Sequence, residues 1–150
     1  MTITVSSLNK FLFFKIPAAF LCGVRVHHFD GERCIVTVKH RWISKNPFKS
    51  MYWAIQGMAA ELASGALVMN QIQLSGKNVS MLVANNKGNF SKKATGRIAF
   101  VCVEGDLVVK ALEEAIKTGE GQSFWMKSIG TNESGEVVSQ MDFEWTIKVK

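Results

Sequence analysis

Residues 51–69 read MYWAIQGMAAELASGALVM, and this stretch decides the fold of the chain. Small or apolar residues occupy almost every position, so a helix formed here is apolar around its circumference and must be surrounded by protein. Glu61 is the single charged residue between Lys49 and Lys77. An ionised carboxylate is costly to bury, so it either shifts its pKa or is held by specific donors. Glu61 is therefore a candidate functional residue and, equally, a candidate structural carboxylate.

The composition indicates one globular domain over residues 1–150, because 150 residues with 47% hydrophobic content can form a substantial core. The net charge of +6 favours anionic partners, although a solvated basic surface explains it equally well. The three cysteines, Cys22, Cys34 and Cys102, form no CxxC pair, which argues against a disulfide framework and against a zinc site. No HExxH, P-loop or GxGxxG motif occurs, and we expect no bound metal.

The N-terminal apolar runs do not predict a membrane anchor. Lys10 and Lys15 interrupt them, and the remaining runs are too short to span a bilayer. The ordered regions of a signal peptide are also missing, so we expect a cytoplasmic protein without a membrane span. Nucleic-acid binding has only the positive charge in its favour, because interleaved surface aromatic residues are not evident.

The hydrophobic pattern predicts one long helix, two short helices and a series of strands. The long helix is expected over Phe48–Gln71, with Asn46 as its N-cap and Pro47 in its first turn. Short helices are expected over Leu8–Lys15 and Leu107–Lys117. Strands are expected over Leu21–Phe29, Arg33–Trp42, Val79–Ala84, Asn89–Thr95, Gly96–Val103, Ser123–Thr131 and Val137–Lys148, with a turn at residues 85–88.

These elements predict an α+β architecture. An antiparallel sheet of five or six strands with one apolar face needs a cover, and one long apolar helix is available. The economical arrangement is the hotdog fold: a curved antiparallel β-sheet wrapped around one long central α-helix. A short N-terminal helix and a short inserted helix complete it.

Several residues then form a recognisable pattern: Pro17, Gly23 at the start of the first strand, Asn46 before the central helix, and Glu61 within it. Residues 46–54 read NPFKSMYWA and residues 89–94 read NFSKKA. This pattern resembles the acyl-CoA thioesterases of the hotdog superfamily, in particular the phenylacetyl-CoA thioesterase-like branch and its uncharacterised relatives.

The chain departs from that family at three places. Tyr52–Trp53–Ala54 stands where the family has His-Gly-Gly, so the glycine amide associated with oxyanion stabilisation has no direct counterpart. The helix acid is Glu61, where many members have Asp. The helix expected at Leu107–Lys117 resembles an insertion between strands.

The residues and the resemblance together give a set of candidate roles. Glu61 would act as general base or nucleophile, and Asn46 would orient the carbonyl or the water, or else simply cap the helix. Backbone N–H groups at the helix start would stabilise the oxyanion. The donor candidates are Tyr52, Trp53 and Ala54; the substrate-binding candidates are Ser64, one turn beyond the acid, and the cations Lys92, Lys93 and Arg97 for coenzyme A phosphates. These cations equally suit a charged edge that resists aggregation.

The implied partner is an acyl-CoA or a related thioester, with coenzyme A entering as part of the substrate and no permanently bound cofactor. A homodimer, or a dimer of dimers, is expected, with sheets meeting edge to edge and a site shared between protomers. A non-catalytic acyl- or acyl-CoA-binding protein on the same fold is the alternative. A hotdog dehydratase fits less well, because the position fourteen residues before Glu61 is Pro47 rather than histidine. The sequence does not identify the acyl chain.

Overall fold

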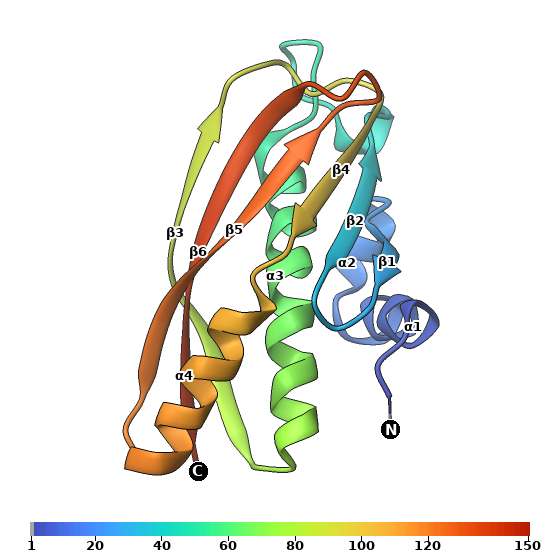
Figure 1. Ribbon diagram of the computed structural model, residues 1–150. Helices are drawn as coiled ribbons and strands as arrows, with labels where there is room; N and C mark the ends of the chain where they lie inside the picture. Colours follow the sequence, from blue (N-terminus) through green and yellow to red (C-terminus); the bar gives the residue numbers. More distant parts are fainter. Residues whose placement is uncertain (1) are drawn as a thin grey trace.

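The structure is a computed structural model that describes residues 2–150. Figure 1 shows a long helix lying along one face of a curved sheet. The helices are α1 (Val5–Lys15), α2 (Pro17–Leu21), α3 (Trp53–Ser75) and α4 (Gly105–Thr118), with a 3-10 turn, η1, at Trp42–Ser44. The strands are β1 (Arg25–Phe29), β2 (Cys34–Lys39), β3 (Val79–Phe90), β4 (Arg97–Cys102), β5 (Gln122–Thr131) and β6 (Val137–Val149).

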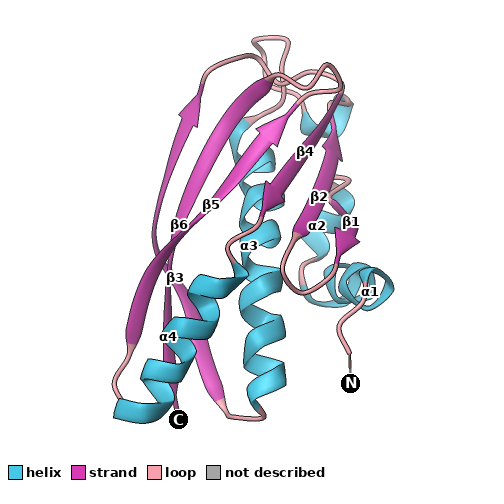
Figure 2. Ribbon diagram, in the orientation of Figure 1, coloured by secondary structure: helices cyan, strands magenta, loops and turns pink. Residues whose placement is uncertain are grey.

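The strands form one antiparallel sheet in the order β1-β2-β4-β5-β6-β3, so β1 and β3 are its edges. Helix α3 packs on β2, β4, β5 and β6, and the sheet curves around it (Figure 2). Helix α4 packs against α3, β5 and β6, while α1 lies by β1. This arrangement confirms the predicted hotdog fold, including the short N-terminal helix and the inserted helix.

The core is the interface between α3 and the inner face of the sheet. The last strand alternates as its sequence predicts: Met141, Phe143, Trp145 and Ile147 are buried, while the residues between them are more exposed. Leu67 and Val68 of α3 are fully buried, as expected for a helix that is apolar on all sides.

A row of hydrogen bonds joins α3 to the sheet. Three donors on β5 and β6 reach three acceptors spaced one helical turn apart on α3. The pairs are Ser139 Oγ to Gln56 Oε1 (2.8 Å), Ser128 Oγ to the Ala60 carbonyl (2.6 Å) and Trp145 Nε1 to Ser64 Oγ (3.0 Å). Positions i, i+4 and i+8 lie on one face of a helix, so this row fixes which side of α3 faces the sheet.

The start of α3 differs from the prediction. The helix begins at Trp53, with Tyr52 at the N-cap position, so Asn46 is not its cap. Asn46 instead organises the preceding loop: its Oδ1 accepts from the amides of Phe48 (2.9 Å) and Ser50 (3.2 Å). Lys49 adopts a left-handed backbone conformation (φ 60°), which a continuing helix does not allow.

The edge strand also differs from the prediction. The turn expected at residues 85–88 is absent, and β3 runs without interruption from Val79 to Phe90, paired with β6 along its length. A bulge between Val83 and Asn85 is its one irregularity. The strand expected over Asn89–Thr95 is therefore wrong, because the chain leaves the sheet after Phe90. Residues 84–90 are exposed on this edge strand, so residues typical of turns are tolerated there.

Two thiols lie inside the sheet. Cys34 of β2 and Cys102 of β4 are directly opposite each other, fully buried and unbonded. Burial raises the pKa of Cys34 to about 12, with a smaller contribution from Cys102, and burial raises the pKa of Cys102 to about 11. Cys22, by contrast, is half-buried in the turn that follows α2.

Breaking the hydrogen-bonded row should destabilise the protein. We expect Ser139→Ala to lower the free energy of unfolding by about 1–3 kcal/mol, because Gln56 Oε1 is buried and loses the donor shown for it. Ser123→Ala on β5 is the matched control: its hydroxyl pairs with Thr146 at an exposed position, and we expect a change within about 0.5 kcal/mol. Urea unfolding followed by circular dichroism measures both, and equal losses would contradict the assignment.

Candidate active site

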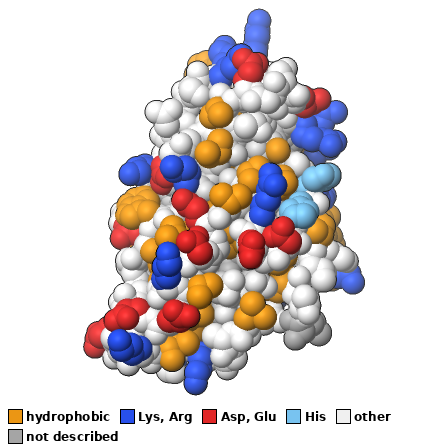
Figure 3. Space-filling model, in the orientation of Figure 1, with side chains coloured by type: hydrophobic (Ala, Val, Ile, Leu, Met, Phe, Trp, Pro, Cys, Tyr) orange, Lys and Arg blue, Asp and Glu red, His pale blue; other side chains and the backbone are white. Residues whose placement is uncertain are grey.

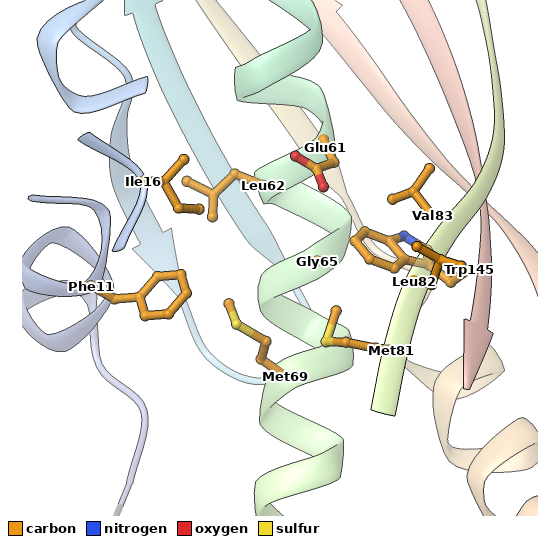
Figure 4. A pocket seen from close by; sticks show the side chains of 10 residues that line it. All are labelled: Phe11, Ile16, Glu61, Leu62, Gly65, Met69, Met81, Leu82, Val83 and Trp145. Carbon is orange, nitrogen blue, oxygen red and sulfur yellow. The ribbon is translucent and has the colours of Figure 1, made fainter. Parts of the chain in front are cut away.

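An apolar cavity of about 440 Å³ lies along the face of α3 that the sheet leaves uncovered. Figure 4 shows its two walls on either side of the helix. One wall comes from the α1–α2 region and the other from β3 and β6. The lining residues are Phe11, Ile16, Glu61, Leu62, Gly65, Met69, Met81, Leu82, Val83 and Trp145. The cavity therefore pairs one acid with a largely aliphatic and aromatic lining.

Glu61 contributes the carboxylate of this cavity. It is half-buried, and its side chain points from α3 into the space between Leu62 and Val83 (Figure 4). No hydrogen bond or ion pair reaches the carboxylate from another residue among 2–150. Burial raises the pKa of Glu61, because the charged form loses hydration that nothing nearby replaces. Glu61 is therefore not a structural carboxylate held by donors from the described residues, and acids in this kind of setting are enriched at functional sites.

Trp145 forms the floor of the cavity beside Glu61. Its ring lies over Gly65, where a Cβ atom would be 3.2 Å from the indole, so a larger residue would push the ring away. Ser64 holds the indole by accepting from Nε1 and donates its own hydroxyl proton to the carbonyl of Glu61 (3.0 Å). Ser64 is fully buried and does not line the cavity, so its place in the structure is to position Trp145 rather than to face a ligand.

A second cavity, of about 460 Å³, surrounds the loop before α3. The structure brings five of the predicted site residues together here: Asn46, Tyr52, Trp53, Lys92 and Lys93. Lys92 forms an ion pair with Glu136, and Lys93 Nζ donates to the carbonyl of Phe48 at 2.8 Å. Both lysines are exposed, at the mouth of this cavity.

A third space connects the two groups of residues. Trp53, Ala54 and Glu61 line a cavity of about 360 Å³ together with β3 and β6 side chains. Trp53 therefore borders both the second cavity and the space that contains the acid. The two cavities thus lie on either side of Trp53, with the lysines bordering one and Glu61 bordering the other.

The backbone donors at the helix start are not all free. The Tyr52 amide donates to the Ser44 carbonyl at 2.8 Å, so it is not available as an oxyanion donor. Trp53 and Ala54 are in the first turn, where amides lack partners within the helix. They precede Glu61 by eight and seven residues, respectively, or about 10–12 Å between backbone positions along the helix axis. Ala54 and Glu61 nevertheless line the same cavity.

Arg97 is separated from the other candidates. It lines a different concavity with Arg25, Lys39 and Arg41. Arg97 is close to Lys92 and Lys93 in the sequence, but in the structure it lines a different cavity from theirs.

Sequence reasoning missed the walls of the acid's cavity. Phe11 and Ile16 belong to the α1–α2 region, and Met81 to the edge strand. The sequence did not mark these residues as cavity walls, because apolar side chains of this kind are equally typical of an ordinary hydrophobic core. Trp145 could have been found, since the alternation of the last strand places it on the inner face.

Other kinds of site are not evident in the described part of the chain. Residues 2–150 contain no cluster of three or more His, Cys, Asp or Glu side chains placed to hold a metal ion. Each helix in this range is too short or too polar to cross a lipid bilayer.

Comparison with solved structures defines the class of protein. One similar structure is a Pseudomonas aeruginosa protein of unknown function, named "Probable Thioesterase". The match covers 100% of this chain and 99% of that protein, with a TM-score of 0.86 and 21% sequence identity. A mutant thioesterase from the same organism gives 0.78 with 15% identity, covering 100% and 97% of the two chains. A thioesterase from Haemophilus influenzae gives 0.74 with 13% identity, covering 99% and 93%. At these identities the likeness establishes the hotdog fold.

The family follows from the sequence. The family model described as "Domain of unknown function (DUF4442)" matches residues 6–147, and the chain belongs to this family. Among curated proteins the sequence has no significant match.

The raised pKa of Glu61 predicts a pH-dependent stability. The folded state binds this proton more tightly than the unfolded chain, where the pKa of Glu is about 4.3. The resulting stabilisation is complete below the unfolded pKa and is lost as the pH rises through the folded pKa. Glu61→Gln cannot ionise, so we expect its stability to increase relative to wild type as the pH rises from about 4 to about 8.

Urea unfolding at a series of pH values measures this difference. The same substitution at the exposed Glu114 is the matched control. A difference between Glu61→Gln and wild type that stays constant over this pH range would contradict a desolvated acid.

Proposed function

We propose that this protein hydrolyses a thioester, as an acyl-CoA thioesterase with Glu61 as its catalytic acid–base or nucleophilic group. The observation that carries the proposal is the unpartnered carboxylate of Glu61, with its raised pKa, at the wall of an apolar cavity. The hotdog fold and the names of the similar structures support the thioester as substrate class.

The chemistry needs a base and an oxyanion donor. As a base, Glu61 takes a proton from water while the water oxygen attacks the thioester carbonyl carbon. The tetrahedral oxyanion then collapses, the carbon–sulfur bond breaks, and the proton passes to the leaving thiolate. A pKa raised towards neutrality makes the carboxylate a better base than an exposed glutamate. As a nucleophile, Glu61 would attack the carbonyl itself and expel the thiolate by breaking the carbon–sulfur bond, and water would then hydrolyse the resulting anhydride.

The acyl group and the coenzyme would occupy different cavities along α3. The aliphatic and aromatic lining around Glu61 suits an acyl chain, because it offers burial without competing hydrogen bonds. The second cavity carries Lys92 and Lys93, which suit phosphate groups of coenzyme A once Lys92 exchanges Glu136 for a phosphate. Asn46 borders that cavity and would help to shape it.

The site is proposed to need a second protomer. The separation of about 10–12 Å between Glu61 and the first-turn amides supports a donor from a neighbouring chain. The free edge of β3 supports sheet-to-sheet pairing: it bonds to β6 alone, and Leu82 on it is 64% exposed. Edge-to-edge pairing would satisfy the unpaired backbone groups of this long strand.

Removing the acid should abolish turnover but spare binding. We expect Glu61→Gln to lower kcat on acyl-CoA substrates by about 10²–10⁴-fold with little change in KM, because general-base catalysis contributes that much. Release of free thiol from short, medium, aromatic and long acyl-CoAs measures the rate. Glu114→Gln, at an exposed position of α4, is the matched control. Equal rates for wild type and Glu61→Gln would remove Glu61 from the mechanism.

A second candidate function has its own supporting observation. The Tyr52 amide is already used by Ser44, and Tyr52–Trp53–Ala54 replaces the His-Gly-Gly of the thioesterases that the chain resembles. A site without an oxyanion donor would bind acyl-CoA without hydrolysing it. Saturable binding of an acyl-CoA by wild type, with no release of thiol over the whole substrate series, would establish this function instead.

The edge-to-edge dimer predicts a specific mutational effect. We expect sedimentation equilibrium to show a dimer at micromolar concentration and Leu82→Lys to shift it towards monomer, because a charge would enter the paired edges. Leu74→Lys is the matched control, since Leu74 is 71% exposed but lies in the last turn of α3. A wild-type monomer, or equal dissociation by both variants, would overturn the shared site.

A further inference from the structure

Four cations converge on the outer face of the sheet, away from α3. Arg25 comes from β1, Lys39 from the end of β2, Arg41 from the segment after β2, and Arg97 from the start of β4. They line one concavity of about 380 Å³, to which Thr37 adds a hydroxyl group. Figure 3 shows Lys and Arg side chains gathered over these ends of β2 and β4.

Among residues 2–150, no side-chain ion pair includes the four cations of this cluster. Glu133 approaches Arg97, but its Oε1 accepts the backbone amide of Arg97 at 2.8 Å. Lys39 and Arg97 are directly opposite in the β2–β4 pair, where like charges destabilise a sheet. Stability therefore does not explain why two cations face each other at this pair.

The guanidinium group of Arg25 is held in place, and that of Arg41 lies close to Gly23. Arg25 Nη1 donates to the carbonyls of Phe20 (2.8 Å) and Val24 (2.7 Å), and its Cζ lies 3.6 Å from the centre of the Phe20 ring. Arg41 occupies the space above Gly23, where a Cβ atom would lie 2.2 Å from Nη2. Burial and the charge of Arg41 lower the pKa of Arg25, so an anion bound here would relieve a repulsion already present.

We propose that this concavity is a binding site for a diphosphate group, held by Arg25, Lys39, Arg41 and Arg97. Planar guanidinium groups bind phosphate oxygens through paired hydrogen bonds, and the ammonium group adds a point charge. Four cations suit a ligand with two or more negative charges better than a single carboxylate. Inorganic pyrophosphate, a nucleoside diphosphate and the diphosphate of coenzyme A share this chemistry. The proposal does not depend on thioester hydrolysis.

Isothermal titration calorimetry with pyrophosphate, ADP and coenzyme A tests the site and separates the three sources. We expect saturable binding of pyrophosphate with Kd below about 1 mM at low salt, weakened by added salt as for an electrostatic site. Tighter binding of ADP or of coenzyme A than of pyrophosphate identifies the rest of the ligand where Arg41→Gln and Arg97→Gln weaken it, because coenzyme A is also proposed to bind at Lys92 and Lys93. We expect Lys39→Gln, Arg41→Gln and Arg97→Gln each to raise Kd on the order of tenfold.

Lys117→Gln is the matched control, because it removes one lysine charge from the last turn of α4, outside this concavity. Circular dichroism melting separates lost binding from lost folding, and Lys39→Gln should not lower the melting temperature because it removes a like-charge pair. The proposal is overturned if no small diphosphate binds, if Lys117→Gln weakens binding equally, or if only DNA or anionic vesicles bind. Glu61 does not line this concavity, so the result of the Glu61→Gln activity assay does not affect this test of diphosphate binding.

Discussion

The structure depends on the row of hydrogen bonds between the sheet and α3 at Gln56, Ala60 and Ser64. A helix that is apolar on every side gains nearly the same burial in any rotation, so hydrophobic packing alone does not choose its orientation. Directional hydrogen bonds do, because each buried polar atom left without its partner carries a cost. With that row against the sheet, Glu61 is turned towards the open side, where the walls of its cavity meet (Figure 4).

That orientation has a cost in stability at one residue. A partly buried carboxylate without partners favours the proton-bound form, so its ionised form costs the folded protein free energy. The basic concavity on the opposite face of the sheet repeats the conflict, with Lys39 facing Arg97 across a strand pair. Natural proteins tolerate such local violations chiefly where a ligand or a reaction repays them. The two faces of the sheet therefore carry two separate departures from the most stable arrangement.

The sequence predicted the architecture because the signals for it are local: the period-two pattern of the last strand and the unbroken apolar run of residues 51–69. It failed where a local signal had two meanings. Asn46–Pro47 has the chemistry of a helix cap, yet Asn46 folds back on its own loop and α3 begins at Trp53. Residues 85–88 have turn chemistry but form an edge strand. The cation cluster had no local signal, because it depends on the neighbour order β1-β2-β4.

The buried thiols of Cys34 and Cys102 can report when the core around β2 and β4 opens. Thiolates, not thiols, attack alkylating reagents, and pKa values of about 12 and about 11 leave almost no thiolate at neutral pH. Both side chains are also fully buried, so covalent labelling requires the core around β2 and β4 to open first. The rate at which a maleimide or iodoacetamide modifies these two native cysteines would therefore report how often that core opens.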